Sequence, residues 1–285
     1  MRSNLVKLRR QMIDYFVTGL AAGCSVVVVG ALFAIFAYLV LKGVGSLNWA
    51  FLTQTPKPVG EAGGGMANAL VGSVIILGIA SLFGVPIGIA AGVYLAEFGR
   101  NRLGKLVRFT SDVLNGVPSI VVGLVAYSLV VIPQGHFSAF AGGVALAIMM
   151  IPTVTRTTEE MLLLVPQAVR EAALGLGIPQ WRTTVSITLA SARAGIITGV
   201  MLAFARVAGE TAPLMFTAFG NQFWSFSSSQ PIAALPLQIF SYAISPFDEW
   251  HRQAWAGALI LVFLIVGTTT FLRFVFLRRM LGGAR

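Results

Sequence analysis

The chain is dominated by six long apolar stretches, each of the length that a helix needs to cross a lipid bilayer. A membrane-spanning helix requires about 20 apolar residues, because the hydrocarbon layer is about 30 Å thick and each residue rises about 1.5 Å. Of the 285 residues, 56% are hydrophobic and only 11% are charged. No run of alternating strands suggests a barrel, so helices must satisfy the backbone. The sequence therefore predicts an all-α, polytopic membrane helix bundle, with spans near 16–41, 67–96, 108–132, 139–161, 193–219 and 254–277.

The distribution of positive charge predicts how these spans are oriented. A net charge of +10 would suggest nucleic-acid binding in a soluble protein, but here the cations gather in particular loops. Fifteen Lys and Arg residues lie before span one, between spans two and three, between spans four and five, and at the end of span six. The opposite loops hold only Lys42, Lys57 and Arg252. The positive-inside rule then places both termini in the cytoplasm. We expect membrane lipid, and no nucleic acid, as the surroundings of this chain.

The sequence lacks a recognisable catalytic or metal site. The segment 99–105 has the spacing of a Walker A loop, but Leu106 stands where a hydroxyl should hold Mg²⁺, and an apolar helix rather than a strand precedes it. His136 and His251 have no second ligand at metal spacing. No pairing of a nucleophile with a base presents itself. We expect no cofactor in this chain, so that any ATP and Mg²⁺ would be bound by another subunit.

Glycine recurs every four residues in two of the spans. Gly84, Gly88 and Gly92 share one face of span two, and Gly195 and Gly199 share one face of span five. Small residues at this spacing let membrane helices approach closely. We therefore expect these faces to be contacts between helices rather than nucleotide sites.

The cytoplasmic segment 165–190, between spans four and five, has the pattern of a short helix, a turn and a second helix. Pro166 can begin a helix over 167–174, and the glycines of 175–177 permit a sharp turn. Pro179 then opens a second helix toward Leu189. Such a unit could insert into a groove of a partner, or it could be an ordinary surface loop. The local physics leaves both possibilities open.

Within this segment, Glu171-Ala172-Ala173, Gly177 and Ile187-Thr188-Leu189 have an order and spacing that resemble the EAA loop of bacterial ABC importer permeases. The motif usually ends in proline, whereas Ala190 stands at that place here. The resemblance implies the type I importer (MetI-like) permease fold. It also implies that Glu171, Ala172, Ala173 and Gly177 couple the loop to a separate ATPase subunit.

Further motifs run from about Gly63 to the last span, among them Ala208-Gly209-Glu210-Thr211-Ala212-Pro213-Leu214 and the segments 64–70, 93–99, 117–124, 156–159 and 221–224. Together they resemble the PstA family of phosphate permeases. The resemblance implies import of inorganic phosphate across the bacterial cytoplasmic (inner) membrane. The implied partners are a PstC-like second permease subunit, two PstB-like ATPases and a periplasmic PstS-like phosphate-binding protein.

Two alternatives to phosphate import stay open at this point. Permeases for sulfate, molybdate or tungstate share the same architecture. A carrier or channel working without ATP would favour inverted repeats or broken midplane helices, and we recognise neither in the sequence.

Two arginines within the apolar spans are candidate anion contacts. Arg206 lies near the middle of predicted span five, with Glu210 one turn later, and Arg156 lies at the inner end of span four. An unpaired charge at such depth costs several kcal/mol, and the planar fork of arginine suits phosphate. Arg206 and Glu210 could line a substrate pathway or only pair with each other. Arg156 could be a second station, or an interfacial cation held by Glu159 or Glu160.

The segment 220–253, between spans five and six, is punctuated by Pro231, Pro236 and Pro246 and is too short between prolines to cross the membrane. We call it the outer segment. Its apolar part, 232–244, could lie against the membrane or dip into the mouth of a pathway, where it would meet a periplasmic receptor. The family resemblance implies that the chain divides into residues 1–65, which hold the tail, the first span and an outer loop, and a five-helix core over 66–281.

Overall fold

The computed structural model describes residues 2–58, 61 and 63–282, and their regular structure is helical. Five stretches are long and apolar enough to cross a membrane, and a bent pair of helices supplies a sixth. The expected all-α bundle with about six spans is therefore confirmed. The larger helices are α1 (Arg2–Gly43), α3 (Ala67–Phe98), α4 (Arg102–Gly116), α5 (Ser119–Ala126), α7 (Ala139–Leu163), α8 (Gln167–Gly175), α10 (Leu189–Ala208), α12 (Leu235–Ala243) and α13 (Asp248–Gly282). Shorter ones are η1 (Val44–Ser46), α2 (Trp49–Thr53), η2 (Tyr127–Val131), α6 (Ile132–Gln134), α9 (Gln180–Thr183), η3 (Thr184–Thr188) and α11 (Ala212–Met215).

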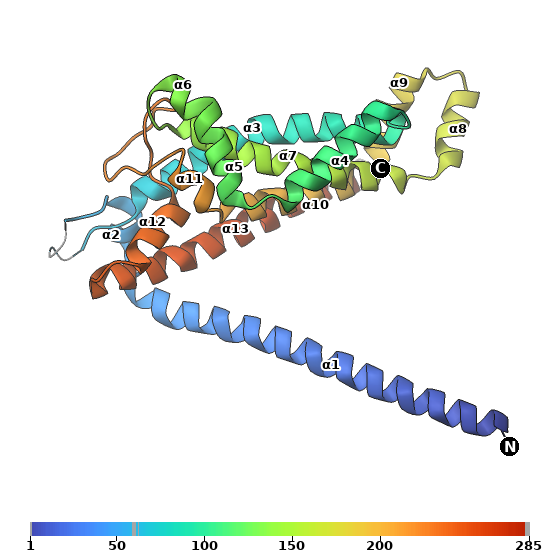
Figure 1. The fold of residues 1–285 in the computed structure, drawn as a ribbon, viewed down its shortest axis with the longest axis horizontal. Coiled ribbons are helices and arrows are strands. Elements are labelled where there is room, and N and C mark those ends of the chain that lie inside the picture. Colours follow the sequence, from blue (N-terminus) through green and yellow to red (C-terminus); the bar gives the residue numbers. More distant parts are fainter. Residues whose placement is uncertain (1, 59–60, 62, 283–285) are drawn as a thin grey trace.

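Helix α7 forms the centre of the bundle, between α3 and α10 (Figure 1). Its close contacts depend on the repeated glycines, as the sequence predicted. A Cβ atom at Gly92 of α3 would lie 2.5 Å from the Cβ of Thr158 on α7, and one at Gly88 would lie 2.6 Å from the Cβ of Val154. On the other side of α7, a Cβ at Gly199 of α10 would lie 2.5 Å from the Oγ1 of Thr157. The three helices pack this closely because these positions carry no side chain.

Span three, expected as one helix over 108–132, is instead two helices that meet at 109°. Helix α4 ends at Gly116, and α5 begins at Ser119. Val117 and Pro118 between them are both extended, because proline disfavours helical backbone in the residue before it and lacks an N–H of its own. The long apolar run concealed this break. The expectation that the chain has no broken span was wrong.

Span five was also placed wrongly, at 193–219. The helical stretch runs from Gln180 to Ala208, so it starts within the segment 165–190 and ends eleven residues earlier than expected. The segment η3 joins α9 to α10 as a π-helix without a break, and Ala190, in place of the usual proline, continues the helix. Gly209 then ends α10, and Pro213 lies in the next short helix, α11.

Helix α1 departs from the rest of the bundle (Figure 1). Only its last turns contact α13: the rings of Tyr38 and Trp255 lie 5.3 Å apart, and those of Phe36 and Phe263 lie 6.5 Å apart. The apolar side chains along its earlier turns are exposed. A surface of this kind is compatible with lipid or with a neighbouring subunit, and not with water.

The outer segment folds back over one end of the bundle. Leu235, at the start of α12, is fully buried, and its N–H donates to the Oγ of Ser73 on α3 at 2.7 Å. Aromatic side chains before α12 stay exposed, among them Phe223 and Phe226. Part of the apolar run thus dips into the bundle, while an aromatic edge remains outside. Helices α8 and α9 lie at the opposite end (Figure 1).

Candidate functional site: an ionic cluster and a loop on the same side of the bundle

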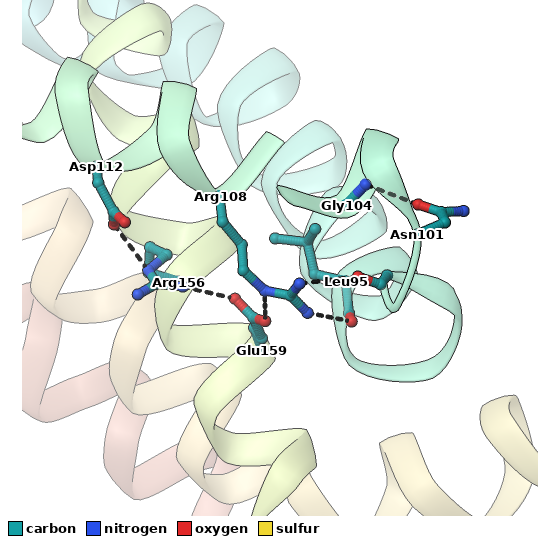
Figure 2. Close-up of polar contacts among 8 residues, drawn as sticks. Leu95, Asn101, Gly104, Arg108, Asp112, Arg156 and Glu159 are labelled. Atoms are coloured by element: carbon teal, nitrogen blue, oxygen red, sulfur yellow. Dashed lines mark hydrogen bonds and ion pairs between the residues drawn. The ribbon is translucent and has the colours of Figure 1, made fainter. Parts of the chain in front are cut away.

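An ionic network joins α4 to α7 (Figure 2). Four side chains form it, and we call them the charge cluster: Arg108 and Asp112 from α4, and Arg156 and Glu159 from α7. Glu159 lies at its centre with only 3% of its side chain exposed. It accepts hydrogen bonds from Arg108 Nε at 2.5 Å and from Arg156 Nη1 at 2.9 Å. A buried carboxylate requires such partners, so Glu159 fixes α4 against α7.

Arg108 uses all three of its nitrogens to hold the fold. Besides the bond to Glu159, its Nη1 donates to the carbonyl of Gly99 and its Nη2 to that of Leu95, both at 2.8 Å. These carbonyls lie at the end of α3, where backbone acceptors have no helical partner. Arg108 therefore ties α3, α4 and α7 together. From the sequence, Arg108 was one of the fifteen cations assigned to loops, and this role was not predicted.

Arg156, expected as a pathway residue or an interfacial cation, is held by Glu159 and not by Glu160. Its Nε also lies 3.0 Å from Oδ1 of Asp112. The side chain of Asp112 is 57% exposed, so this part of the cluster faces open space in the isolated chain. The sequence analysis did not single out Asp112. A signal existed, because Arg108 and Asp112 are four residues apart and lie on one face of α4.

A second polar pair lies beside the charge cluster. Thr153 of α7 donates to Oδ1 of Asn115 on α4 at 3.0 Å. Thr153 is three residues from Arg156, and Asn115 is three residues from Asp112, so both pairs lie along the same helix faces. We call these four residues the polar lane. Polar side chains in membrane helices face the bundle interior or a water-filled path, so the lane marks a possible route for a polar solute.

Arg206 lies near the end of α10 rather than in the middle of a span. Its depth is nevertheless central. Gly199 lies against Thr157 of α7, and the same antiparallel register carried seven residues further sets Arg206 level with Met150. Met150 in turn contacts Gly84, close to the centre of α3. This register places Arg206 level with the middle of α3.

The expectation that Glu210 lies one helical turn beyond Arg206 is wrong, and the alternative in which the two only pair with each other is not supported. Helix α10 ends at Ala208, so Glu210 lies beyond the helix instead of one turn along it. Within the described part of the chain, the two side chains form no ion pair and no hydrogen bond with each other. Arg206 is exposed in the isolated chain, and Glu210 is half-buried. The structure does not unite Arg206 with the charge cluster either.

The segment 165–190 forms the predicted helix-turn-helix, and we call it the coupling loop. Helix α8 covers Gln167–Gly175, and α9 begins at Gln180. Gly177 has φ +77°, a left-handed conformation that only glycine adopts without strain. Glu171 is exposed and accepts a hydrogen bond from Gln167, whereas Ala173 is buried. The turn that the sequence placed at 175–177 is therefore confirmed.

Arg170 anchors the coupling loop to two membrane helices. Its Nη1 lies 2.7 Å from Oε1 of Glu97 on α3, and its Nη2 donates to the carbonyl of Leu162 on α7 at 2.6 Å. The side chain of Glu97 is 8% exposed and that of Arg170 is 19% exposed. A cavity of about 400 Å³ lies beside this pair, between the loop and the ends of α3 and α7.

The far side of the coupling loop is apolar and open. Leu176 is 81% exposed, and Trp181 is 68% exposed. Exposed apolar groups of this size on a loop outside the apolar spans are typical of a contact surface for another protein.

Comparison with known proteins agrees with this geometry. Residues 84–281 match the family described as binding-protein-dependent transport system inner membrane component. The chain is also 48% identical over 241 residues to the phosphate transport system permease protein PstA of Yersinia pestis, covering 84% of this chain and 82% of that one. The chain belongs to the PstA family. Another PstA, from Xylella fastidiosa strain Temecula1, is 46% identical over 267 residues, with 90% of each chain covered.

Solved structures place the PstA family chain in a known fold. A chain of the MetNI methionine ABC transporter, in a structure described as inward facing, aligns with a TM-score of 0.59 and 16% identity, covering 77% of this chain and 98% of that one. A chain of an amino acid ABC transporter aligns with a TM-score of 0.52 and 20% identity, covering 74% and 92%. The expected MetI-like permease fold is thereby confirmed.

Proposed function

We propose that this PstA family chain is the permease subunit of an ATP-driven importer that carries inorganic phosphate into the cytoplasm of a bacterium. The observation that carries this proposal is the identity of 40–50% to proteins named PstA across most of the chain. Two arginines, the half-buried Arg156 and the exposed Arg206, supply the chemistry that an anion needs. The broken span does not favour a carrier without ATP, because the fold is that of ABC transporter chains.

The partners follow from the same proposal. A PstC-like permease would complete the pathway, two PstB-like ATPases would bind ATP and Mg²⁺, and a periplasmic PstS-like protein would deliver phosphate. The coupling loop, with Glu171, Ala172, Ala173 and Gly177, would dock on an ATPase through its exposed apolar side. The outer segment would receive the binding protein at the opposite end of the bundle. Both termini would then lie in the cytoplasm.

Transport would proceed by alternating access. Closure of the ATPases would move the coupling loop, and Arg170 would transmit this motion to α3 and α7, because it forms an ion pair with Glu97 of α3 and donates a hydrogen bond to α7. Phosphate released at the outer face would first meet Arg206, at mid-depth, and then the polar lane with Arg156. Arginine keeps its charge at any working pH, so neither station would depend on a change of protonation.

The test is uptake by the assembled complex. Express the chain with its three partners in cells that lack other phosphate carriers, and measure uptake of labelled phosphate with and without an excess of unlabelled sulfate, molybdate or tungstate. We expect phosphate uptake that these anions do not suppress, together with co-purification of an ATPase and a binding protein on the tagged chain. Uptake of another oxyanion in place of phosphate would refute the proposed cargo. Uptake without any ATPase would refute the proposed class.

A further inference from the structure

The two arginines of the charge cluster differ in how many nitrogens they commit. Arg108 donates from Nε, Nη1 and Nη2 to three acceptors inside the fold. Arg156 is held firmly at one nitrogen only, Nη1, by the buried Glu159. Its Nε lies against Asp112, and its Nη2 makes no hydrogen bond within the described part of the chain. Arg108 is therefore structural, whereas Arg156 keeps one edge of its guanidinium incompletely used.

That edge has the shape that an oxyanion prefers. The Nε–H and one Nη2–H of a guanidinium point the same way and together bind two oxygens of one carboxylate or phosphate. Asp112 occupies this edge through one contact, from Oδ1 to Nε at 3.0 Å. Its side chain is mostly exposed, so little holds it in place besides Arg156. An anion that engages both nitrogens would compete with it effectively.

We propose that Asp112 is an internal counter-ion that occupies the phosphate-binding edge of Arg156 between transport events and is displaced by the arriving anion. The proposal rests on the function proposed above. In this role, Asp112 competes with phosphate for Arg156 and thereby lowers the affinity of this site for phosphate. Arg156 does not lose its position in the exchange, because Glu159 keeps hold of Nη1 and Arg108 keeps hold of Glu159.

Charge balance supports the exchange. The charge cluster contains two cations and two carboxylates, so it is neutral while Asp112 is bound. When Asp112 swings away, Arg156 retains an unmet positive charge that a monoanionic phosphate restores to neutrality. A neutral solute cannot do this, and so it gains nothing by displacing the carboxylate. Competition from Asp112 also limits how long phosphate stays, which favours release toward the cytoplasm.

The experiment measures phosphate binding by the complex of two permease subunits and two ATPases, purified in lipid nanodiscs without the periplasmic binding protein. Binding of labelled inorganic phosphate is compared for the wild type, Asp112→Asn, Arg156→Gln, the double variant of these two changes, and the control Glu160→Gln. Glu160 is an exposed carboxylate on α7 next to Glu159, and it forms no ion pair in the described part of the chain. The control therefore changes the same formal charge without touching Arg156.

We expect Asp112→Asn to bind phosphate about two- to fivefold more tightly than the wild type, the factor that removal of one exposed competing ion pair gives. Uptake at saturating phosphate should fall in the same variant, because release becomes slower. Glu160→Gln should match the wild type, and Arg156→Gln should abolish the effect of Asp112→Asn in the double variant. If Asp112 merely positions Arg156, Asp112→Asn will bind phosphate more weakly or equally, and the proposal is overturned.

The test includes a substitute variant and a measurement with other anions. Asp112→Ser replaces Asp112→Asn if the latter fails to assemble, and the same tightening is required of it. If the wild-type complex imports another oxyanion instead of phosphate, the proposed function fails, and the same binding comparison with labelled sulfate and molybdate decides the role of Asp112.

Discussion

Glu97, in the last turn of α3, lies 2.7 Å from Arg170 of α8, and this pair connects the coupling loop directly to a membrane helix. Both side chains are largely buried. The contact fixes the loop to the bundle at two points, because the same guanidinium also holds the end of α7.

We expect Glu97→Gln to uncouple transport. Removing one partner of a largely buried pair costs about 3 kcal/mol, since the other charge is left without compensation. Phosphate uptake should fall strongly while the chain still inserts, and ATP hydrolysis by the complex should lose its dependence on the binding protein. Arg182→Gln is the control, because Arg182 is exposed on the same loop and forms no ion pair among the described residues. Unchanged uptake in Glu97→Gln would contradict a role of the Glu97–Arg170 pair in coupling.

Gly177 offers a test of the turn in which backbone conformation can be separated from steric crowding. A Cβ atom at Gly177 or at Gly175 would meet open space, yet only Gly177 has a positive φ. Gly177→Val should therefore cost about 1–2 kcal/mol of local backbone strain, whereas Gly175→Val should cost less. We expect weaker co-purification of the ATPase and lower phosphate uptake for Gly177→Val alone. Equal behaviour of the two variants would show that the turn conformation is unimportant for coupling.

Arg206 should act on the anion without help from Glu210. Because no ion pair joins them in the described structure, Arg206→Gln leaves no buried partner stranded, and the complex should assemble normally. Uptake of labelled phosphate should be lost in Arg206→Gln and intermediate in Arg206→Lys, since lysine keeps the charge but not the fork. Arg193→Gln, an exposed change on the same helix, serves as the control. Recovery of uptake in the double variant Arg206→Gln with Glu210→Gln would mean that Arg206 does not handle the anion.

Gly92 tests the packing of α3 against α7. An added methyl would lie 2.5 Å from the Cβ of Thr158 and 2.7 Å from the carbonyl of Thr155, so Gly92→Ala should destabilise the bundle by about 1–3 kcal/mol. Gly78→Ala adds the same methyl to the same helix where nothing lies within 4 Å. Thermal unfolding in detergent should show a lower midpoint for Gly92→Ala only. A similar midpoint for both variants would contradict the close contact.

The chain alone should neither bind nor hydrolyse ATP. The segment 99–105 forms the turn between α3 and the first residues of α4, so a helix precedes it, and Leu106 offers no hydroxyl for Mg²⁺. The purified chain, freed of contaminating ATPases and checked with a Lys105→Ala variant, should show no phosphate release from ATP. Activity that disappears in Lys105→Ala would overturn this prediction.

Hydropathy and glycine spacing were enough to predict the membrane class and the tight helix contacts, because both follow from residue types and their local spacing in the sequence. The break at Pro118 and the end of α10 at Ala208 were missed, since an apolar run hides where the backbone stops being helical. Asp112 and Glu97 were missed for a different reason: their importance comes from Arg156 and Arg170, which are distant in sequence. Pairing across helices leaves little trace in a single sequence.

The π-helical segment η3, at 184–188, has one residue more in its turn than an α-helix would have. That extra residue changes the direction in which the side chains before η3 point relative to those of α10 after it. Deleting one residue there would turn the preceding part of the coupling loop, 165–183, about the axis of α10 by about 100°, the angle between successive residues of an α-helix, and would break the contacts of Arg170 with α3 and α7. The apolar side chains of the loop would then face a different direction, although every other residue of the chain stayed the same.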